Sequence, residues 1–167
     1  AIITEFLSLA QNKVRYMREG NQSEIVKNMV PLLQAEADRL DRRLEVRCKK
    51  TRSFLLSVNE LRQMIVNLVK NALEAVNKEG RVLLETYTEG DYAVLAVRDN
   101  GPGIAPAIYE KLGIPFVSTK EKGPGLGLPV CYRIAHRYKA NLDVDTGPAG
   151  TNMYVRFPAG KSSLAEQ

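Results

Sequence analysis

The stretch VRDNGPGI, residues 97–104, joins the end of an apolar run to one carboxylate and to two glycines that flank a proline. Its Asp-Asn-Gly core is ordinary turn chemistry, because Asx side chains bond their own backbone and Gly accepts a positive φ. Taken alone, these residues therefore predict a strand followed by a tight turn. Whether the carboxylate of Asp99 has a further use depends on the rest of the chain.

The segments around this turn predict a mixture of helices and strands. Strands at 81–88 and 92–98 form a predicted hairpin, and further strands are predicted in LEVRCKK, in FLLSVN, at 141–146 and at 152–157. Helices are predicted from Ser23, with Ser23 as N-cap and Pro31 as a kink or a later start, and over 60–76 and 126–138. Regular βαβ alternation and internal repeats are absent from the sequence. We therefore expect an α/β two-layer sandwich, with a mixed sheet of five to six strands packed on about three helices.

Composition narrows the classes of ligand. The 167 residues carry 24 Lys and Arg against 19 Asp and Glu, a net charge of +5, which suits a polyanionic ligand but not a nucleic-acid arm. Two distant cysteines and one histidine give neither zinc spacing nor a disulfide framework. Since no apolar run of about 18 residues and no leader occur, we expect a cytoplasmic fragment without membrane contact.

The predicted helix over 60–76 has a polar stripe opposite its apolar face. A solvated surface explains Glu60 and Gln63 at one end of this stripe. Asparagine, however, competes with the helix backbone, so Asn67 and Asn71 at i and i+4 indicate side-chain oxygens required in fixed places. Such neutral oxygens suit Mg²⁺ that is shared with a nucleotide phosphate. The apolar face consists of Leu61, Met64, Ile65, Leu68, Val69, Ala72 and Val76, and the stripe ends at Glu74.

The glycine-rich stretch KGPGLGLPV, residues 122–130, matches neither of the two common phosphate-loop patterns. A flexible connector is one interpretation. Its place directly before a predicted helix favours the other, because unpaired N–H groups and the helix dipole make an anion site. Lys120 and Lys122 add positive charge just upstream.

Together these motifs resemble the ATP-binding catalytic domain of bacterial sensor histidine kinases, in the GHKL superfamily that also holds DNA gyrase, the mismatch-repair ATPase and a heat-shock chaperone. NLVKNALEA looks like the asparagine box, DNGPGI and GPGLGL the two glycine boxes, IPFVSTKEKG the phenylalanine box and lid, and GTNMYVRFP the closing strand. The likeness spans residues 24–158, is greatest to the sporulation and nitrogen-sensor subgroup, and implies a Bergerat-type fold. IITEFLSLAQ is similar to the end of a second dimerisation helix. The expected division is therefore a helix remnant at 1–18, a catalytic domain at 19–160 and a disordered tail at 161–167.

The resemblance assigns a role to each motif. Asp99 would accept a hydrogen bond from the adenine amino group, with Thr151 helping through water and Ile104 excluding solvent. Asn71 would bind Mg²⁺, and Asn67 would contact phosphate, so these two are the expected catalytic residues. The other expected ATP contacts are Lys70, Gly101, Gly103, Phe116, Thr119, Lys120, Lys122, Gly123, Gly125, Leu126, Gly127 and Leu128.

Two departures from the family pattern shape the functional hypothesis. Pro124 stands where the family often has Thr, and His136 lacks the acidic neighbour of the phosphoacceptor motif. The chain therefore resembles a catalytic fragment that phosphorylates a histidine on a dimerisation domain outside it, in a homodimeric kinase with a cognate response regulator. Alternatives are a GHKL-type ATPase or clamp, whose general-base Glu is replaced here by Asn67, and a non-catalytic nucleotide-binding regulator.

Overall fold

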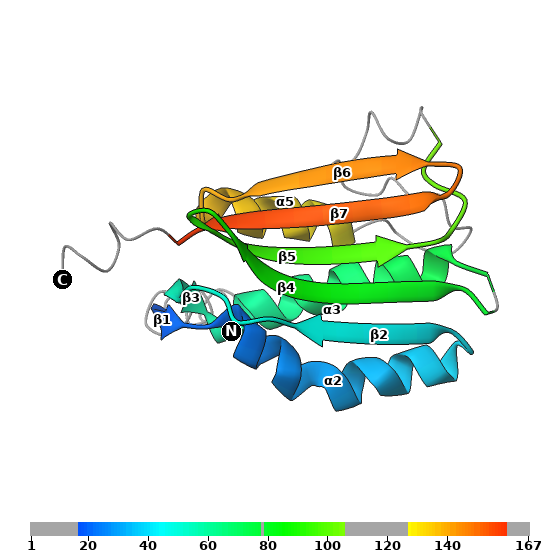
Figure 1. The fold of residues 1–167 in the computed structure, drawn as a ribbon, viewed down its shortest axis with the longest axis horizontal. Helices are drawn as coiled ribbons and strands as arrows, with labels where there is room; N and C mark the ends of the chain where they lie inside the picture. The colour runs from blue at the N-terminus through cyan, green and yellow to red at the C-terminus, as the bar shows by residue number, and fades with distance from the viewer. Residues whose placement is uncertain (1–16, 78, 106–126, 160–167) are drawn as a thin grey trace, which may run out of the picture.

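A mixed five-stranded sheet forms one layer of the computed structural model, which describes residues 17–77, 79–105 and 127–159 (Figure 1). The strand order is β2-β4-β5-β7-β6, in which β2 lies parallel to β4 and the other neighbours are antiparallel. The predicted hairpin and the mixed sheet are confirmed. The strands are β2 (Arg43–Cys48), β4 (Arg81–Glu89), β5 (Tyr92–Asp99), β6 (Asn141–Gly147) and β7 (Gly150–Pro158).

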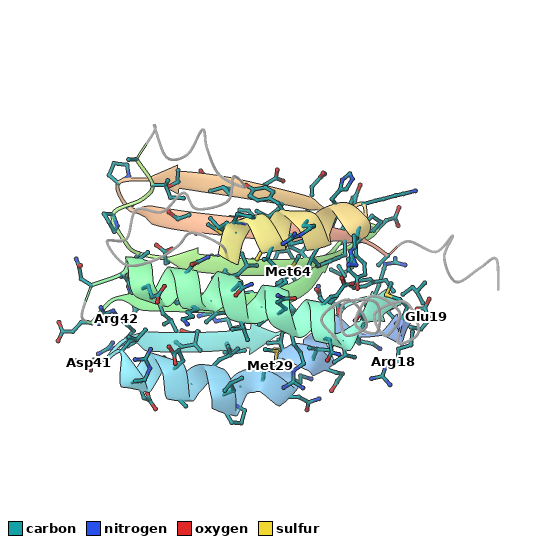
Figure 2. All side chains as sticks on the ribbon, turned by 180° about the vertical axis from the view of Figure 1, so that it is seen from behind. Arg18, Glu19, Met29, Asp41, Arg42 and Met64 are labelled. Atoms are coloured by element: carbon teal, nitrogen blue, oxygen red, sulfur yellow. The ribbon has the colours of Figure 1, made fainter. Side chains whose placement is uncertain are left out.

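Helices form the second layer and cover one face of the sheet. In the described part of the chain they are α2 (Gln22–Arg39), α3 (Val58–Ala75) and α5 (Gly127–Arg137), with α3 between the other two (Figures 1 and 2). None of these helices is both long and apolar enough to span a membrane. The two-layer α/β sandwich predicted from the sequence is therefore confirmed.

The core lies between these layers. Every residue of the predicted apolar face of α3 is buried, including Leu61, Ile65 and Val69, which are fully inaccessible. Opposite them, alternate residues of β5 and β7 point to the helices, because successive side chains of a strand face opposite sides. Each buried Leu or Ile contributes about 1.5–3 kcal/mol relative to exposure, so this face fixes α3 on the sheet.

The start of α2 differs from the prediction. Its N-cap is Asn21, whose Oδ1 accepts the Ser23 N–H at 2.9 Å, so the predicted N-cap at Ser23 is wrong. Asn21 also donates from Nδ2 to the Thr51 carbonyl, and the Ser23 hydroxyl is instead buried against Thr86. Pro31 lies inside α2 on the exposed side, and the helix neither ends nor begins there.

The first described residues belong to a second, two-stranded sheet. Strand β1 (Met17–Gly20) pairs antiparallel with β3 (Phe54–Ser57), so the helix expected to reach residue 18 does not include Met17 and Arg18. The remainder of that expected dimerisation-helix remnant, residues 1–16, and the expected tail lie outside the described residues.

The predicted solvent exposure of Glu60 is wrong. Its side chain is buried, whereas Gln63 on the same stripe is exposed as predicted. The Tyr138 hydroxyl donates to Glu60 Oε1 at 3.2 Å and accepts the Ser57 N–H at 2.8 Å, and Arg137 lies 2.9 Å from Glu60 Oε2. Burial raises the pKa of Tyr138 to about 12. This polar cluster therefore joins the start of α3 to the end of α5.

We predict that Tyr138→Phe destabilises the domain by about 1–3 kcal/mol, because it leaves the Ser57 N–H and one Glu60 oxygen without their partner in a buried place. Urea unfolding followed by circular dichroism measures the change. Tyr92→Phe, at an exposed position of β5, is the matched control and should stay within about 0.5 kcal/mol of wild type. Equal stability of the two variants would remove the structural role of the Tyr138 hydroxyl.

Candidate functional site

The strand register brings three polar residues together at one edge of the sheet, the edge formed by the ends of β5 and β6 and the start of β7. The sequence predicted two of them, Asp99 and Thr151, as site residues but not the third, Thr146. Asp99, the last residue of β5, is paired with Thr151 of β7, and Thr151 is paired in turn with Thr146 of β6. Asp99 is far in sequence from the two threonines but adjacent to Thr151 across the ladder. Because antiparallel partners carry their side chains on the same face, the carboxylate and both hydroxyls meet there.

The Asp99 carboxylate is held by backbone donors. Its Oδ1 accepts the Gly101 N–H at 2.9 Å and the Thr151 N–H at 3.3 Å. Burial raises the pKa of this carboxyl above its ordinary value, and the two N–H groups partly oppose that effect. Within the described residues, neither bond engages Oδ2, so one acceptor of a fixed carboxylate is available to an external donor.

The turn after Asp99 fits closely against two other elements. Gly103 has a φ of +85°, and a Cβ there would lie 2.2 Å from the Gly147 carbonyl oxygen. A Cβ on Gly101 would lie 3.1 Å from the Ala75 carbonyl at the end of α3. These contacts explain why position 103 requires glycine and why a side chain at position 101 would be tightly packed, and they place the end of α3 beside the turn.

Asn67 and Asn71 lie on α3, two turns and one turn before Ala75, and both are half-buried. Their helix therefore carries amide side chains toward the end at which the glycine turn is docked. Lys70 occupies a different side of α3. It lines an apolar groove against α2 and lies close enough to Glu36 to help Arg39 lower the pKa of that carboxyl.

The phosphate-binding expectations can be located only in part. Helix α5 begins at Gly127, next to half-buried Leu128, which packs against the core. The other glycine-loop and lid residues lie outside the described part of the chain; these are Phe116, Thr119, Lys120, Lys122, Gly123, Gly125 and Leu126.

Sequence reasoning missed Thr146. Its Oγ1 accepts the Ile104 N–H at 2.8 Å and lies 2.8 Å from Thr151 Oγ1. The available signal was the short TGPAGT hairpin, which brings residue 146 opposite the predicted Thr151. The role of Asn100 was also missed, since its Oδ1 accepts the Arg81 N–H and ties the turn to β4.

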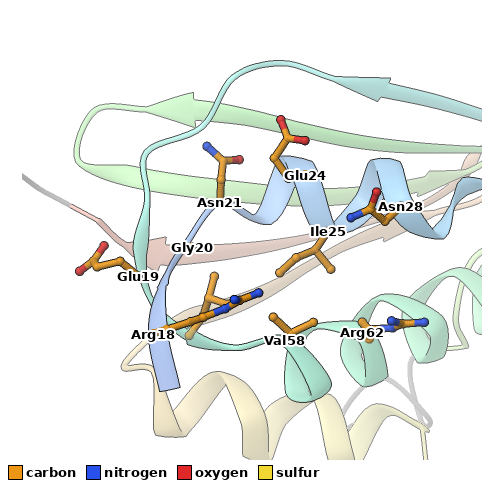
Figure 3. A pocket seen from close by; sticks show the side chains of 10 residues that line it. Arg18, Glu19, Gly20, Asn21, Glu24, Ile25, Asn28, Val58 and Arg62 are labelled. Atoms are coloured by element: carbon orange, nitrogen blue, oxygen red, sulfur yellow. The ribbon is translucent and has the colours of Figure 1, made fainter. Parts of the chain in front are cut away.

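A surface pocket, called here the second hollow to distinguish it from the site at the sheet edge, lies at the opposite end of α3, between β1 and the starts of α2 and α3 (Figure 3). Arg18 and Arg62 face it from different elements, with Glu24 and Ile25 on the α2 side. Asp99, Asn67 and Asn71 are not among its lining residues, so it is separate from the site at the sheet edge.

The residues at the sheet edge suit a nucleotide. A fixed carboxylate acceptor and adjacent hydroxyls match a base that offers an N–H. The amide oxygen of Asn71 is a hard ligand of the type that Mg²⁺ accepts beside phosphate oxygens. The donor set therefore fits Mg²⁺ and ATP.

The fold and this site define a nucleotide-binding α/β sandwich domain. Residues 57–161 match the family of histidine kinase-, DNA gyrase B- and HSP90-like ATPases, and the chain belongs to that family. Membership confirms the resemblance seen in the sequence motifs and implies ATP binding.

Relatives and solved structures agree with this assignment. Sporulation kinase C of Bacillus subtilis (strain 168) is 33% identical over 147 residues, which are 87% of this chain and 34% of that protein. The sensory histidine kinase/phosphatase NtrB of Escherichia coli O157:H7 is 33% identical over 114 residues, 62% of this chain and 33% of NtrB. The chain thus spans about a third of these relatives. The catalytic domain of histidine kinase ThkA shares the fold, with a TM-score of 0.77 at 21% identity over 88% of this chain and 98% of that one.

We predict that Asp99→Asn leaves the ligand-free domain at least as stable as wild type at neutral pH. Because the folded-state pKa is raised above 3.8, the contribution of this carboxyl to stability is present below that pH and is lost as the pH rises through the folded pKa. The amide keeps an oxygen for both N–H groups and does not ionise. Urea unfolding at several pH values should show that the free energy of unfolding of the variant, relative to that of wild type, increases as the pH rises. A relative free energy of unfolding that decreases as the pH rises would contradict the assignment.

Proposed function

We propose that this chain is the ATP-binding catalytic domain of a two-component sensor histidine kinase, which transfers the γ-phosphate of ATP to a histidine on a dimerisation domain outside the chain. The observation that carries this proposal is the composition of α3 near the glycine turn. Asn67 and Asn71 supply amides there, and position 67 holds no carboxylate that could take a proton from water. The site is therefore better suited to positioning an acceptor than to activating water.

Each residue has a proposed role in that reaction. Asp99 Oδ2 accepts the adenine amino group, Ile104 excludes water, and Thr151 assists through its hydroxyl. Asn71 would ligate Mg²⁺, which neutralises charge between the β and γ phosphates when bound. Asn67 would contact phosphate together with the lid residues Lys120 and Lys122. Lys70 contributes only if it leaves the groove beside α2.

The acceptor comes from another segment or chain in this proposal. His136 is the sole histidine, and it is exposed in the last turn of α5, next to Arg137. It lacks the acidic neighbour that the family has beside its phosphoacceptor histidine. We propose instead a homodimeric, cytoplasmic kinase unit in which the dimerisation domain supplies the histidine and a cognate response regulator receives the phosphate.

A GHKL-type ATPase or clamp is the second candidate, favoured by family membership alone. It requires a general base at position 67 or an equivalent group. The neutral Asn67 amide disfavours that function and predicts slow hydrolysis.

We predict that the chain, mixed with labelled Mg-ATP and the separately produced dimerisation domain of its parent kinase, labels a histidine of that domain. Without that domain no phosphohistidine should form. Asn71→Ala should lower labelling at least tenfold and remove the Mg²⁺ dependence of ADP binding, because the metal matters most during transfer. Acid-labile phosphate is measured after gel separation.

The matched control is Gln63→Ala, which removes an exposed amide two turns from Asn71 on the same helix. Its labelling should equal that of wild type. Label on the isolated chain that is lost in His136→Ala would contradict the proposed transfer to a separate domain, and rapid ATP hydrolysis without any label would favour the ATPase.

A further inference from the structure

Arg42 bonds the ends of two helices that are far apart in the sequence. Its Nε donates to the carbonyl of Val76, the C-cap of α3, at 2.9 Å, and its Nη1 donates to the carbonyl of Leu40, the C-cap of α2. Figure 2 shows Arg42 at the C-terminal ends of these helices. The guanidinium is half-buried there, and its planar fork of donors suits two acceptors at once.

The backbone of Arg42 is fixed by the way α2 ends. The Asp41 N–H donates to the Asp38 carbonyl at 3.1 Å, and the Arg42 N–H donates to the Ala37 carbonyl at 2.9 Å. These are the two bonds of a Schellman motif, in which Asp41 has a φ of 58°. Since β2 begins at the next residue, the Arg42 side chain starts from a backbone position that is held on both sides.

The end of α3 takes its positive charge from this other segment. The last turn of α3 contains no basic residue of its own. Its carbonyl groups lack helical partners and carry the negative end of the helix dipole, so a cationic donor is favoured there. The chain leaves the helix at Val76, whose ψ is 155°. Arg42 therefore supplies both a hydrogen bond and a charge at the point where α3 ends.

The same end of α3 supports the candidate functional site. A Cβ on Gly101 would lie 3.1 Å from the Ala75 carbonyl oxygen, so the turn that follows Asp99 is packed on the residue next to Val76. Asn71 lies one turn before Ala75 on the same helix. A shift of this helix end would therefore move the Asn71 amide relative to the Asp99 carboxylate.

We propose that Arg42 is a positioning residue, which fixes the Asn71 amide relative to the Asp99 carboxylate by holding the end of α3. One nucleotide has to reach both groups, because adenine is placed at Asp99 and the metal and phosphates at Asn71. Arg42 acts through the Val76 carbonyl and does not touch the nucleotide. The inference rests on the proposed function, since it assumes that the nucleotide binds at this site.

Amide hydrogen exchange of the ligand-free chain tests whether Arg42 holds the end of α3. Arg42→Met keeps an aliphatic side chain but removes the donors and the charge. The Val76 N–H donates to the Ala72 carbonyl at 3.3 Å, and its exchange rate relative to that of the Leu68 N–H, two turns earlier, should rise about tenfold in this variant. An unchanged ratio of the two rates would overturn the hold of Arg42 on α3.

Calorimetry with ADP, in the presence and absence of Mg²⁺, tests the consequence for the site. The measured quantity is the ratio of the two dissociation constants, because a loss of folded protein weakens both by the same factor and leaves their ratio unchanged. Arg42→Met should lose most of the Mg²⁺ enhancement of wild type, while its affinity for ADP without Mg²⁺ should stay within about threefold. Arg42→Lys keeps the charge but not the fork of donors, so it should lose the enhancement too. It also replaces Arg42→Met if that variant does not fold.

Arg43→Met is the matched control, because it removes the same charge at the next position. The Arg43 side chain is exposed, and among the described residues it makes no hydrogen bond or ion pair, so both measured ratios should equal those of wild type. A wild-type Mg²⁺ enhancement in either Arg42 variant would overturn the positioning role, and so would a wild type without any enhancement. Failure of wild type to bind ADP would overturn the proposed function itself, whereas the exchange rates would still report whether Arg42 holds α3.

Discussion

The carboxylate of Asp99, held by the N–H groups of Gly101 and Thr151, is the interaction on which the site depends. This interaction forms because β5 is a central strand whose apolar residues are buried. Their burial fixes where the strand ends and therefore where Asp99 lies. Once Oδ1 is occupied by the backbone, only Oδ2 remains for a ligand. The burial that raises the pKa of this group is thus the cost of a selective acceptor, and adenine binding is the proposed compensation.

The sequence predicted the elements whose periodicity is strong. The apolar face of α3 and the β4–β5 hairpin were confirmed because one buried face dictates each pattern. Asn21, Glu60 and β1 were not predicted correctly, since tertiary partners decide them. Glu60 is buried by Tyr138, which is 78 positions away, and no local pattern distinguishes such a glutamate from a solvated one.

The site was predictable to the extent that its motifs resemble a known family. Asp99, Thr151 and the glycines were named from the motifs, and the strand register brings Asp99 to Thr151. Thr146 was missed, because its importance arises from a hairpin that returns it to the glycine turn. Lys70 shows the limit of a helical pattern: the pattern separates polar from apolar faces but does not say that this side chain lies beside α2 rather than near Asn71.

The most direct test of the central claim is an NMR titration of the ¹⁵N-labelled chain with Mg-ADP. The account predicts that the largest amide shift changes fall on Gly101, Ile104 and Thr151, at the sheet edge that holds Asp99. Gly90, in the turn between β4 and β5 at the other end of these strands, should change little. Shifts confined to that far end, or to Arg18 and Arg62 around the second hollow, would contradict the claim that nucleotide binds beside Asp99.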